Sequence, residues 1–186
     1  ADGRLTLKGA VREIMATEML TALDVPTSKT FSVVETGEAL HRNDEPSPTR
    51  SAVMIRLLHS HIRIGSFQRC AYFGDEQAME TLARHVVTYH YSEINPDKDA
   101  ETLYLALMSE MTARVADMVG AWMTAGFLHG VMNTDNFNLT GETFDFGPWR
   151  FIPYCDPAFT AAYFDQQSRY AYGRQPEAAL WALCRL

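Results

Sequence analysis

The feature that most constrains the fold is a long run of helical periodicity at residues 99–127. Its apolar residues recur every three or four positions, which is the spacing of one face of an α-helix. Such a helix is stable mainly when other elements pack against its apolar face. We therefore expect it to be the centre of a helical core. The residues on that face are Leu103, Leu107, Met111, Val115 and Val119.

The residues before this run predict a helix, two antiparallel strands and a second helix, in that order. The helical segments have apolar residues at helical spacing, and the strands are rich in β-branched residues. The helices are expected at 7–23, with Val11, Ile14, Met15 and Met19 at that spacing, and at 76–91; the strands are expected at 29–35 and 51–58, with a loop at 36–50. A last helix begins near Pro176, because proline fits the first turn of a helix. The order predicts a small α+β part followed by a mostly helical part.

The composition indicates a globular domain with an acidic surface. The chain has 186 residues, 47% of them hydrophobic, and a net charge of −7. An acidic balance argues against a nucleic-acid partner, because phosphate backbones favour a basic face. No run of about 18 apolar residues predicts a membrane span, so no membrane partner is expected. Since no targeting segment is evident, we expect a cytoplasmic protein of bacterial type.

Cysteines and histidines do not predict a soft-metal site. The three cysteines are far apart and odd in number, which favours reduced, mostly buried thiols over a disulfide framework or a zinc site. Three histidines could bind a metal ion together, but the magnesium ion expected below prefers oxygen ligands. These residues are Cys70, Cys155 and Cys184, and His59, His61 and His129.

Residues 129–149 carry the chemical signal. Kinases use a loop of the form H-x-D-x-x-x-x-N followed by D-F-G. His129 and Asn136 have this seven-residue offset, and Asp145 begins a literal D-F-G nine residues after Asn136. A triphosphate needs a divalent cation to neutralise its charge, and carboxylate and amide oxygens are suitable ligands. The spacing therefore predicts that Asn136 and Asp145 bind Mg²⁺, or Mn²⁺, beside ATP.

One position departs from the kinase pattern. The aspartate expected two residues after His129 is Val131, which cannot accept a proton. Asp135 is the nearest carboxylate able to act as the catalytic base. The alternative is an ordinary polar surface loop, in which Asn and Asp act as turn formers.

Several blocks make the resemblance to one family specific. They run in order along the chain: ADGR at 1–4, VPTSKTFS at 25–32, SHIRIGSFQ at 60–68, HGVMNTDN at 129–136, FDFGPW at 144–149 and YGRQPEA at 172–178. The sequence resembles the selenoprotein O (SelO) family of protein adenylyltransferases over essentially its whole length. The combination of NTDN with FDFGPW is not general to kinases.

The resemblance implies an α+β protein-kinase-like fold that transfers AMP from ATP to Ser, Thr or Tyr hydroxyls of proteins. ATP is held in a flipped orientation compared with ordinary kinases. Residues 1–70 would form part of the small lobe and the hinge, a helix plus antiparallel strands. Residues 71–186 would form the mostly helical large lobe with the catalytic loop. The resemblance also suggests that some of the protein substrates are redox-linked.

The resemblance further assigns residues that contact the nucleotide. Glu13 matches the helix glutamate that pairs with the small-lobe lysine. Arg56 and Arg63 match the arginines that hold the nucleotide phosphates, and Asp2 and Gly3 match nucleotide contacts in the small lobe. Without the family, Glu13 would be interpreted as a solvated helix carboxylate, because glutamate is almost always exposed.

The family's small lobe begins before residue 1, and its ATP-contacting lysine lies upstream of ADGR. We therefore expect the chain to be a core fragment without the family's upstream and downstream regions, and to be weakly active or inactive alone. Two other functions stay open: a non-catalytic nucleotide-binding pseudokinase module, and a phosphotransferase.

Overall fold

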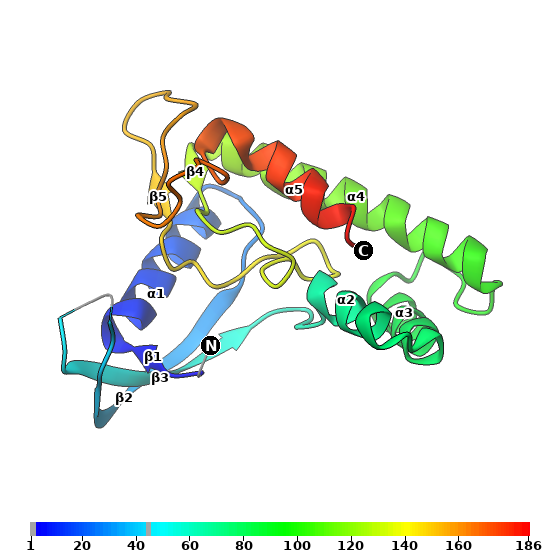
Figure 1. The fold of residues 1–186 in the computed structure, drawn as a ribbon, viewed down its shortest axis with the longest axis horizontal. Helices are drawn as coiled ribbons and strands as arrows, with labels where there is room; N and C mark the ends of the chain where they lie inside the picture. The colour runs from blue at the N-terminus through cyan, green and yellow to red at the C-terminus, as the bar shows by residue number, and fades with distance from the viewer. Residues whose placement is uncertain (1–2, 44–45) are drawn as a thin grey trace.

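The computed structural model describes residues 3–43 and 46–186 as an α+β arrangement of helices and two small antiparallel sheets. The sheet with helix α1 lies at one end of the molecule and α2 and α3 lie at the other, while α4, with α5 beside it, runs between the two ends (Figure 1). In chain order the elements are β1 (Leu5–Thr6), α1 (Leu7–Ala22), β2 (Lys29–Leu40), β3 (Thr49–Leu57), α2 (Ile64–Phe73), α3 (Glu76–His90), α4 (Ala100–Ala125), β4 (Phe127–Leu128), β5 (Arg150–Phe151), a short 3₁₀ helix (Tyr172–Arg174) and α5 (Gln175–Leu183).

The larger sheet has the strand order β1-β3-β2, and the predicted antiparallel pairing of β2 with β3 is confirmed. Strand β2 is longer than expected, because residues 36–40 were predicted to form a loop. A register shift between Glu35 and Ala39 absorbs the positive φ of Gly37, and pairing resumes at Ala39 and Arg50. A bulge of this kind lets a strand continue across turn-forming residues.

Helix α1 forms where the sequence predicts it, but the face that packs is different from the expected one. Val11, Met15 and Met19 are exposed. The buried face instead carries mostly small residues, because these allow the helix to approach the sheet closely. They are Ala10, Glu13, Ala16, Thr17 and Leu20. Thr6 begins the helix by accepting a hydrogen bond from the backbone N–H of Gly9 at 3.0 Å.

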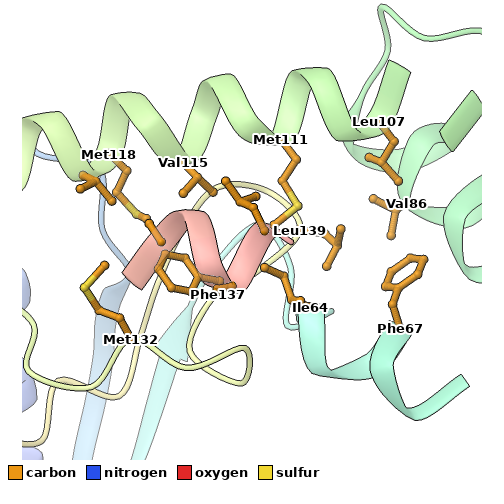
Figure 2. Packing of buried hydrophobic residues seen from close by; sticks show 14 of the residues in the cluster. Ile64, Phe67, Val86, Leu107, Met111, Val115, Met118, Met132, Phe137 and Leu139 are labelled. Carbon is orange, nitrogen blue, oxygen red and sulfur yellow. The ribbon is translucent and has the colours of Figure 1, made fainter. Parts of the chain in front are cut away.

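The predicted face of α4 is confirmed, and all five of its residues are buried. Helix α2 was not predicted. Its buried residues Ile64 and Phe67 stand three positions apart and pack into the same cluster as α3 and α4. Figure 2 shows Ile64 and Phe67 pointing toward the apolar residues that α4 presents, among them Met111.

The polar loop that follows β4 is anchored to this core by apolar side chains. Met132, Phe137 and Leu139 are buried, and Figure 2 shows them on the side of α4 that carries Val115 and Met118. The core therefore fixes the loop at three points and leaves the residues between Met132 and Phe137 to form a turn.

Two smaller expectations concern the burial of the cysteines and helices that could cross a membrane. The three cysteines are free, but Cys155 and Cys184 are exposed, so the expected burial was wrong for them. Within residues 3–43 and 46–186, no helix combines the length and the apolar character that crossing a membrane requires.

Candidate functional site

A cleft of about 620 Å³ opens between the larger sheet, α1 and the segment that contains Asp145. Its lining includes Gly3, Glu13, Arg56 and Asp145, which the sequence analysis assigned to nucleotide or metal binding. These residues come from three parts of the chain: the N-terminal segment through α1, strand β3, and the segment that contains Asp145. The fold brings them together because α1 follows β1 directly and packs on both β2 and β3.

Glu13 and Arg56 form an ion pair inside this cleft. Arg56 Nη2 lies 2.7 Å from Glu13 Oε2, and the Glu13 residue is only 4% exposed, so it is not the solvated carboxylate of the alternative interpretation. Burial raises the pKa of Glu13 to about 7, and nearby Asp145 adds to this rise, although Arg56 and the Phe146 backbone N–H favour the charged form. The cleft therefore holds a carboxyl group that can change its charge near neutral pH.

Phe144 is the centre of a group of cationic and aromatic side chains at the cleft. The guanidinium carbon of Arg56 lies 5.7 Å from the Phe144 ring centroid, and that of Arg63 lies 5.9 Å from it. His61 meets the same ring edge-on at 5.5 Å. Burial and these two arginines lower the pKa of His61. One ring thus positions both arginines that the resemblance assigns to the phosphates.

Asn133 organises the turn that presents Asp135 and Asn136. Its side-chain oxygen accepts the backbone N–H of Asp135 at 2.9 Å, and its carbonyl accepts that of Asn136 at 3.0 Å. Asn136 is buried and its Nδ2 donates to the Val131 carbonyl at 2.8 Å. Because the nitrogen of the amide is used in this way, the oxygen is the atom that could bind a cation.

The unpredicted helix α2 supports the same turn. The backbone N–H groups of Ile64 and Gly65 donate to the carbonyls of Phe137 and Thr134, each at 3.1 Å. Asp135 lies directly over Gly65, since a Cβ added there would come within 2.2 Å of Asp135 Oδ1. The N-terminus of α2 therefore fixes the position of the predicted base, and only glycine leaves its carboxylate in place.

His129 joins this turn to the segment before Asp145. Burial lowers its pKa to about 4, so the ring is neutral near pH 7. Its Nδ1 faces the Val131 N–H at 3.4 Å and therefore accepts, which assigns the proton to Nε2. Nε2–H then donates to Thr143 Oγ1 at 2.9 Å. A backbone bridge between Phe137 and Thr143 holds the same two segments side by side.

Gln175, at the start of α5, fixes the chain on the other side of His129. The side chain is fully buried; its Nε2 donates to the Phe127 carbonyl at 2.9 Å and its Oε1 accepts the His129 N–H at 3.1 Å. The nitrogen and the oxygen of one side-chain amide thus both bind the backbone of the segment that precedes the loop.

Asp145 has a backbone conformation that is rare for a residue with a side chain. Its φ is +64°, and its side chain is exposed toward the cleft. Such conformations cluster at functional sites, where surrounding contacts maintain them. An exposed carboxylate here and the Asn136 oxygen on the adjacent segment are hard oxygen donors of the kind that Mg²⁺ prefers, so the residues fit this ion.

The three histidines considered as metal ligands have different partners. His59 Nδ1 lies 2.8 Å from Glu142 Oε1, His61 packs on Phe144, and His129 binds Thr143. The contact of His59 holds the linker after β3, that of His61 lies in the cleft, and that of His129 holds the loop.

The structure places most of the predicted site residues around one region. Arg63 is close to the turn, because its Nη1 points to the Asp135 carbonyl at 3.5 Å. Asp2 lies outside the described residues. Four contributors were not foreseen: Gly65, Phe144, Gln175 and, as a cleft residue, His61. The unusual glycine one residue after Ile64 in SHIRIGSFQ was the signal available for Gly65.

These features define an α+β protein with a cleft that contains Arg56, near a turn that carries carboxylate and amide side chains, an arrangement suited to an anionic ligand. The sequence profile of the family described as protein adenylyltransferase SelO matches residues 1–186. The chain belongs to this family.

Curated relatives are similar along the whole chain. A protein from Synechocystis sp. named protein nucleotidyltransferase YdiU is 49% identical over 185 residues, covering 100% of this chain and 39% of the relative. Proteins with the same name from Trichormus variabilis and Rhodopseudomonas palustris are 50% and 44% identical, covering 98% and 100% of this chain and 37% and 36% of those relatives. The chain thus spans less than two fifths of these relatives' length.

Proposed function

We propose that this chain forms the catalytic core of a protein adenylyltransferase, which transfers AMP from ATP to Ser, Thr or Tyr hydroxyls. The observation that carries the proposal is the meeting of Gly3, Glu13, Arg56 and Asp145 in one cleft. Family membership and the names of the relatives support nucleotidyl transfer. The succession of β1, α1 and the β2–β3 pair before a helical part supports a protein-kinase-like fold.

In this proposal Arg56 and Arg63 bind the phosphates of ATP, since a planar guanidinium suits phosphate oxygens. Phe144 holds both guanidinium groups at similar distances from its ring. Arg56 must then exchange its contact with Glu13 for a phosphate, or keep both. Gly3 lies in the cleft with a positive φ, which supports its assignment as a nucleotide contact in the small lobe; Asp2 is assigned by the resemblance alone.

The reaction forms one bond and breaks another at the α-phosphorus. The oxygen of the acceptor hydroxyl attacks this phosphorus, the bond to the bridging oxygen of the β-phosphate breaks, and pyrophosphate leaves with the electron pair. Asp135 accepts the proton of the hydroxyl, and the Asn133 turn and α2 hold it in place. Alignment by fixed groups contributes much of the rate of such transfers.

Asn136 and Asp145 would hold Mg²⁺, or Mn²⁺. When bound, this ion would neutralise charge on the phosphates and on the leaving group. The chain's own contribution would be to hold together the two segments that carry these residues, through the His129–Thr143 hydrogen bond and the Phe137–Thr143 bridge.

The decisive experiment compares ATP labelled at the α or at the γ phosphate, using the full-length protein that contains this chain. Label transferred to protein from the α position, with the adenine, supports adenylylation. Label transferred only from the γ position would make the protein a phosphotransferase instead. ATP binding without any transfer would favour the non-catalytic module, which the presence of Val131 in the loop also favours.

A further inference from the structure

A second hollow, which shares no lining residue with the nucleotide cleft, is formed partly by the loop that carries Asp135. It has a volume of about 230 Å³, below the roughly 300–1,000 Å³ of pockets that hold small-molecule ligands. This size suits a side chain. Its walls come from the loop of Asp135, from the segment before α5 and from α5 itself; they include Met132, Arg169, Tyr170, Arg174, Glu177 and Trp181.

The charges of this pocket do not cancel. Arg174 binds Glu177 through two hydrogen bonds of 3.0 Å each, so these two residues neutralise one another. Among the residues that the structure describes, no carboxylate forms an ion pair with Arg169. The carboxylate of Asp165, which lies in the same wall and acts electrostatically on Arg174, offsets one further positive charge, so the excess positive charge of the pocket comes from Arg185. Arg185, whose guanidinium lies 4.8 Å from the Trp181 ring centroid, adds positive charge at the rim.

The wall that carries Arg169 is fixed before any ligand arrives. The Asp165 carboxylate accepts the backbone N–H of Arg169 at 2.8 Å and that of Tyr170 at 2.7 Å. Since this carboxylate is bound to the backbone, it holds the segment that carries Arg169 in place. A rigid wall reduces the entropy cost of binding.

The position of the pocket relates it to the transfer reaction. Met132, which is buried in its wall, stands three residues before Asp135. Three residues of extended chain span at most about 11 Å. A substrate segment whose hydroxyl lies at Asp135 can therefore reach the pocket with a side chain two to four residues away.

We propose that this pocket binds an aspartate or glutamate side chain of the protein substrate, two to four residues from the acceptor hydroxyl. The carboxylate pairs with Arg169, and its methylene groups lie on Trp181 and Met132. Such a pairing of a charged donor with a carboxylate is among the stronger hydrogen bonds in proteins. The inference rests on the proposed function, because it names the substrate of that site.

The test uses the full-length protein, α-labelled ATP and peptides with one acceptor hydroxyl. At each of the positions two to four residues before and after the hydroxyl, the peptides carry Asp, Ala or Lys. We expect at least one acidic position to improve kcat/KM by roughly ten-fold over Ala, mostly through KM. Arg169→Glu should reverse this order so that the Lys peptide becomes the better substrate, and Arg169→Lys should restore the preference for Asp.

Lys98→Glu is the matched control, because it makes the same charge change on the exposed loop between α3 and α4. It should leave the peptide preference unchanged. The ATP affinity of Arg169→Glu, measured by calorimetry, should equal that of the wild type, which also shows that the variant is folded.

The outcomes separate this inference from the proposed function. Transfer from α-labelled ATP that ignores the charge of every peptide position would overturn the inference alone. An Arg169→Glu variant with weakened ATP binding would assign the pocket to the nucleotide and overturn it too. If no peptide or protein accepts AMP from the wild type, the proposed function fails, and the inference fails with it.

Discussion

Glu13 of α1 and Arg56 of β3 form an ion pair of 2.7 Å at the back of the cleft, and both side chains are almost fully buried. The pair joins the helix to the sheet on the face that carries small apolar residues. Desolvation of two charges is costly, so such a pair contributes little to stability as a unit. Removing one partner is different, because the other is left buried without compensation.

Arg56→Met should therefore destabilise the nucleotide-free protein by about 3–5 kcal/mol at pH 8, where Glu13 is ionised. The double variant Glu13→Gln with Arg56→Met should recover much of this loss, since no buried charge remains. Urea unfolding of the wild type, both single variants and the double variant measures the cycle. Additive effects of the two substitutions would contradict the coupling of these residues.

The pH dependence of stability should contain a contribution from Glu13 that falls as pH rises. Its pKa is raised from 4.5 to about 7 in the folded chain, so the folded state binds more protons than the unfolded state between these values. The stabilisation is fully present below pH 4.5 and is lost as pH rises through 7. In the wild type this residue should lower the free energy of unfolding by up to about 1.4 kcal/mol for each pH unit between these pKa values, and Glu13→Gln should remove that decrease. Unfolding curves of the wild type and of Glu13→Gln at pH 5, 6, 7 and 8 test this prediction. If the free energies of unfolding of the two proteins change in parallel with pH, the prediction is contradicted.

Much of the fold could be predicted because strong periodicity marks long elements. The α4 face at Leu103, Leu107 and Met111 shows this, since one side of a long helix must be covered. The face of α1 could not be predicted in this way. Its apolar Val11 and Met15 are exposed, whereas Glu13 is buried by a partner 43 residues away in β3.

For the candidate site, the sequence could predict which segments lie together only where one local motif contains them. Asn136 and Asp145 belong to such a motif, and the contacts of His129 explain why their segments stay together. Helix α2 was missed because only Ile64 and Phe67 mark its short apolar face. The roles of Phe144 and Gln175 depend on contacts with segments far away in the chain, and no spacing in the sequence encodes those contacts.

Asp145→Ala in the full-length protein should reduce Mg²⁺-dependent ATP binding by more than ten-fold, because one of the two proposed oxygen ligands is lost. Thermal unfolding without nucleotide controls for the fold; the unfolding temperature should fall only slightly, since Asp145 is exposed and alanine tolerates a φ of +64° less well than aspartate does. Calorimetric titration with ATP, with and without Mg²⁺, is the measurement. An unchanged affinity in the presence of Mg²⁺ would remove Asp145 from the metal site.

Asp135→Ala should have the opposite effect to Asp145→Ala: ATP binding should be retained and AMP transfer should be lost. We expect ATP affinity to stay within about two-fold of the wild type, because in the proposed mechanism the carboxylate accepts the proton of the acceptor hydroxyl and does not bind the phosphates. AMP transfer should fall by roughly 10²–10⁴-fold, the usual contribution of a general base. Single-turnover transfer from α-labelled ATP measures the loss. A variant that labels protein at the wild-type rate would show that another group accepts the proton.

Gly65→Ala tests the placement of Asp135 without touching it. Alanine is the better helix former by about 1 kcal/mol, so stability should hold or rise if the Asp135 side chain can move. It must move, since the new Cβ would come within 2.2 Å of Oδ1. We expect slower AMP transfer with unchanged ATP affinity. Gly120→Ala in α4 is the matched control, because a Cβ there meets nothing within 4 Å. This substitution should raise stability without slowing AMP transfer. Equal transfer rates in both variants would mean that the carboxylate over Gly65 is not the one that acts.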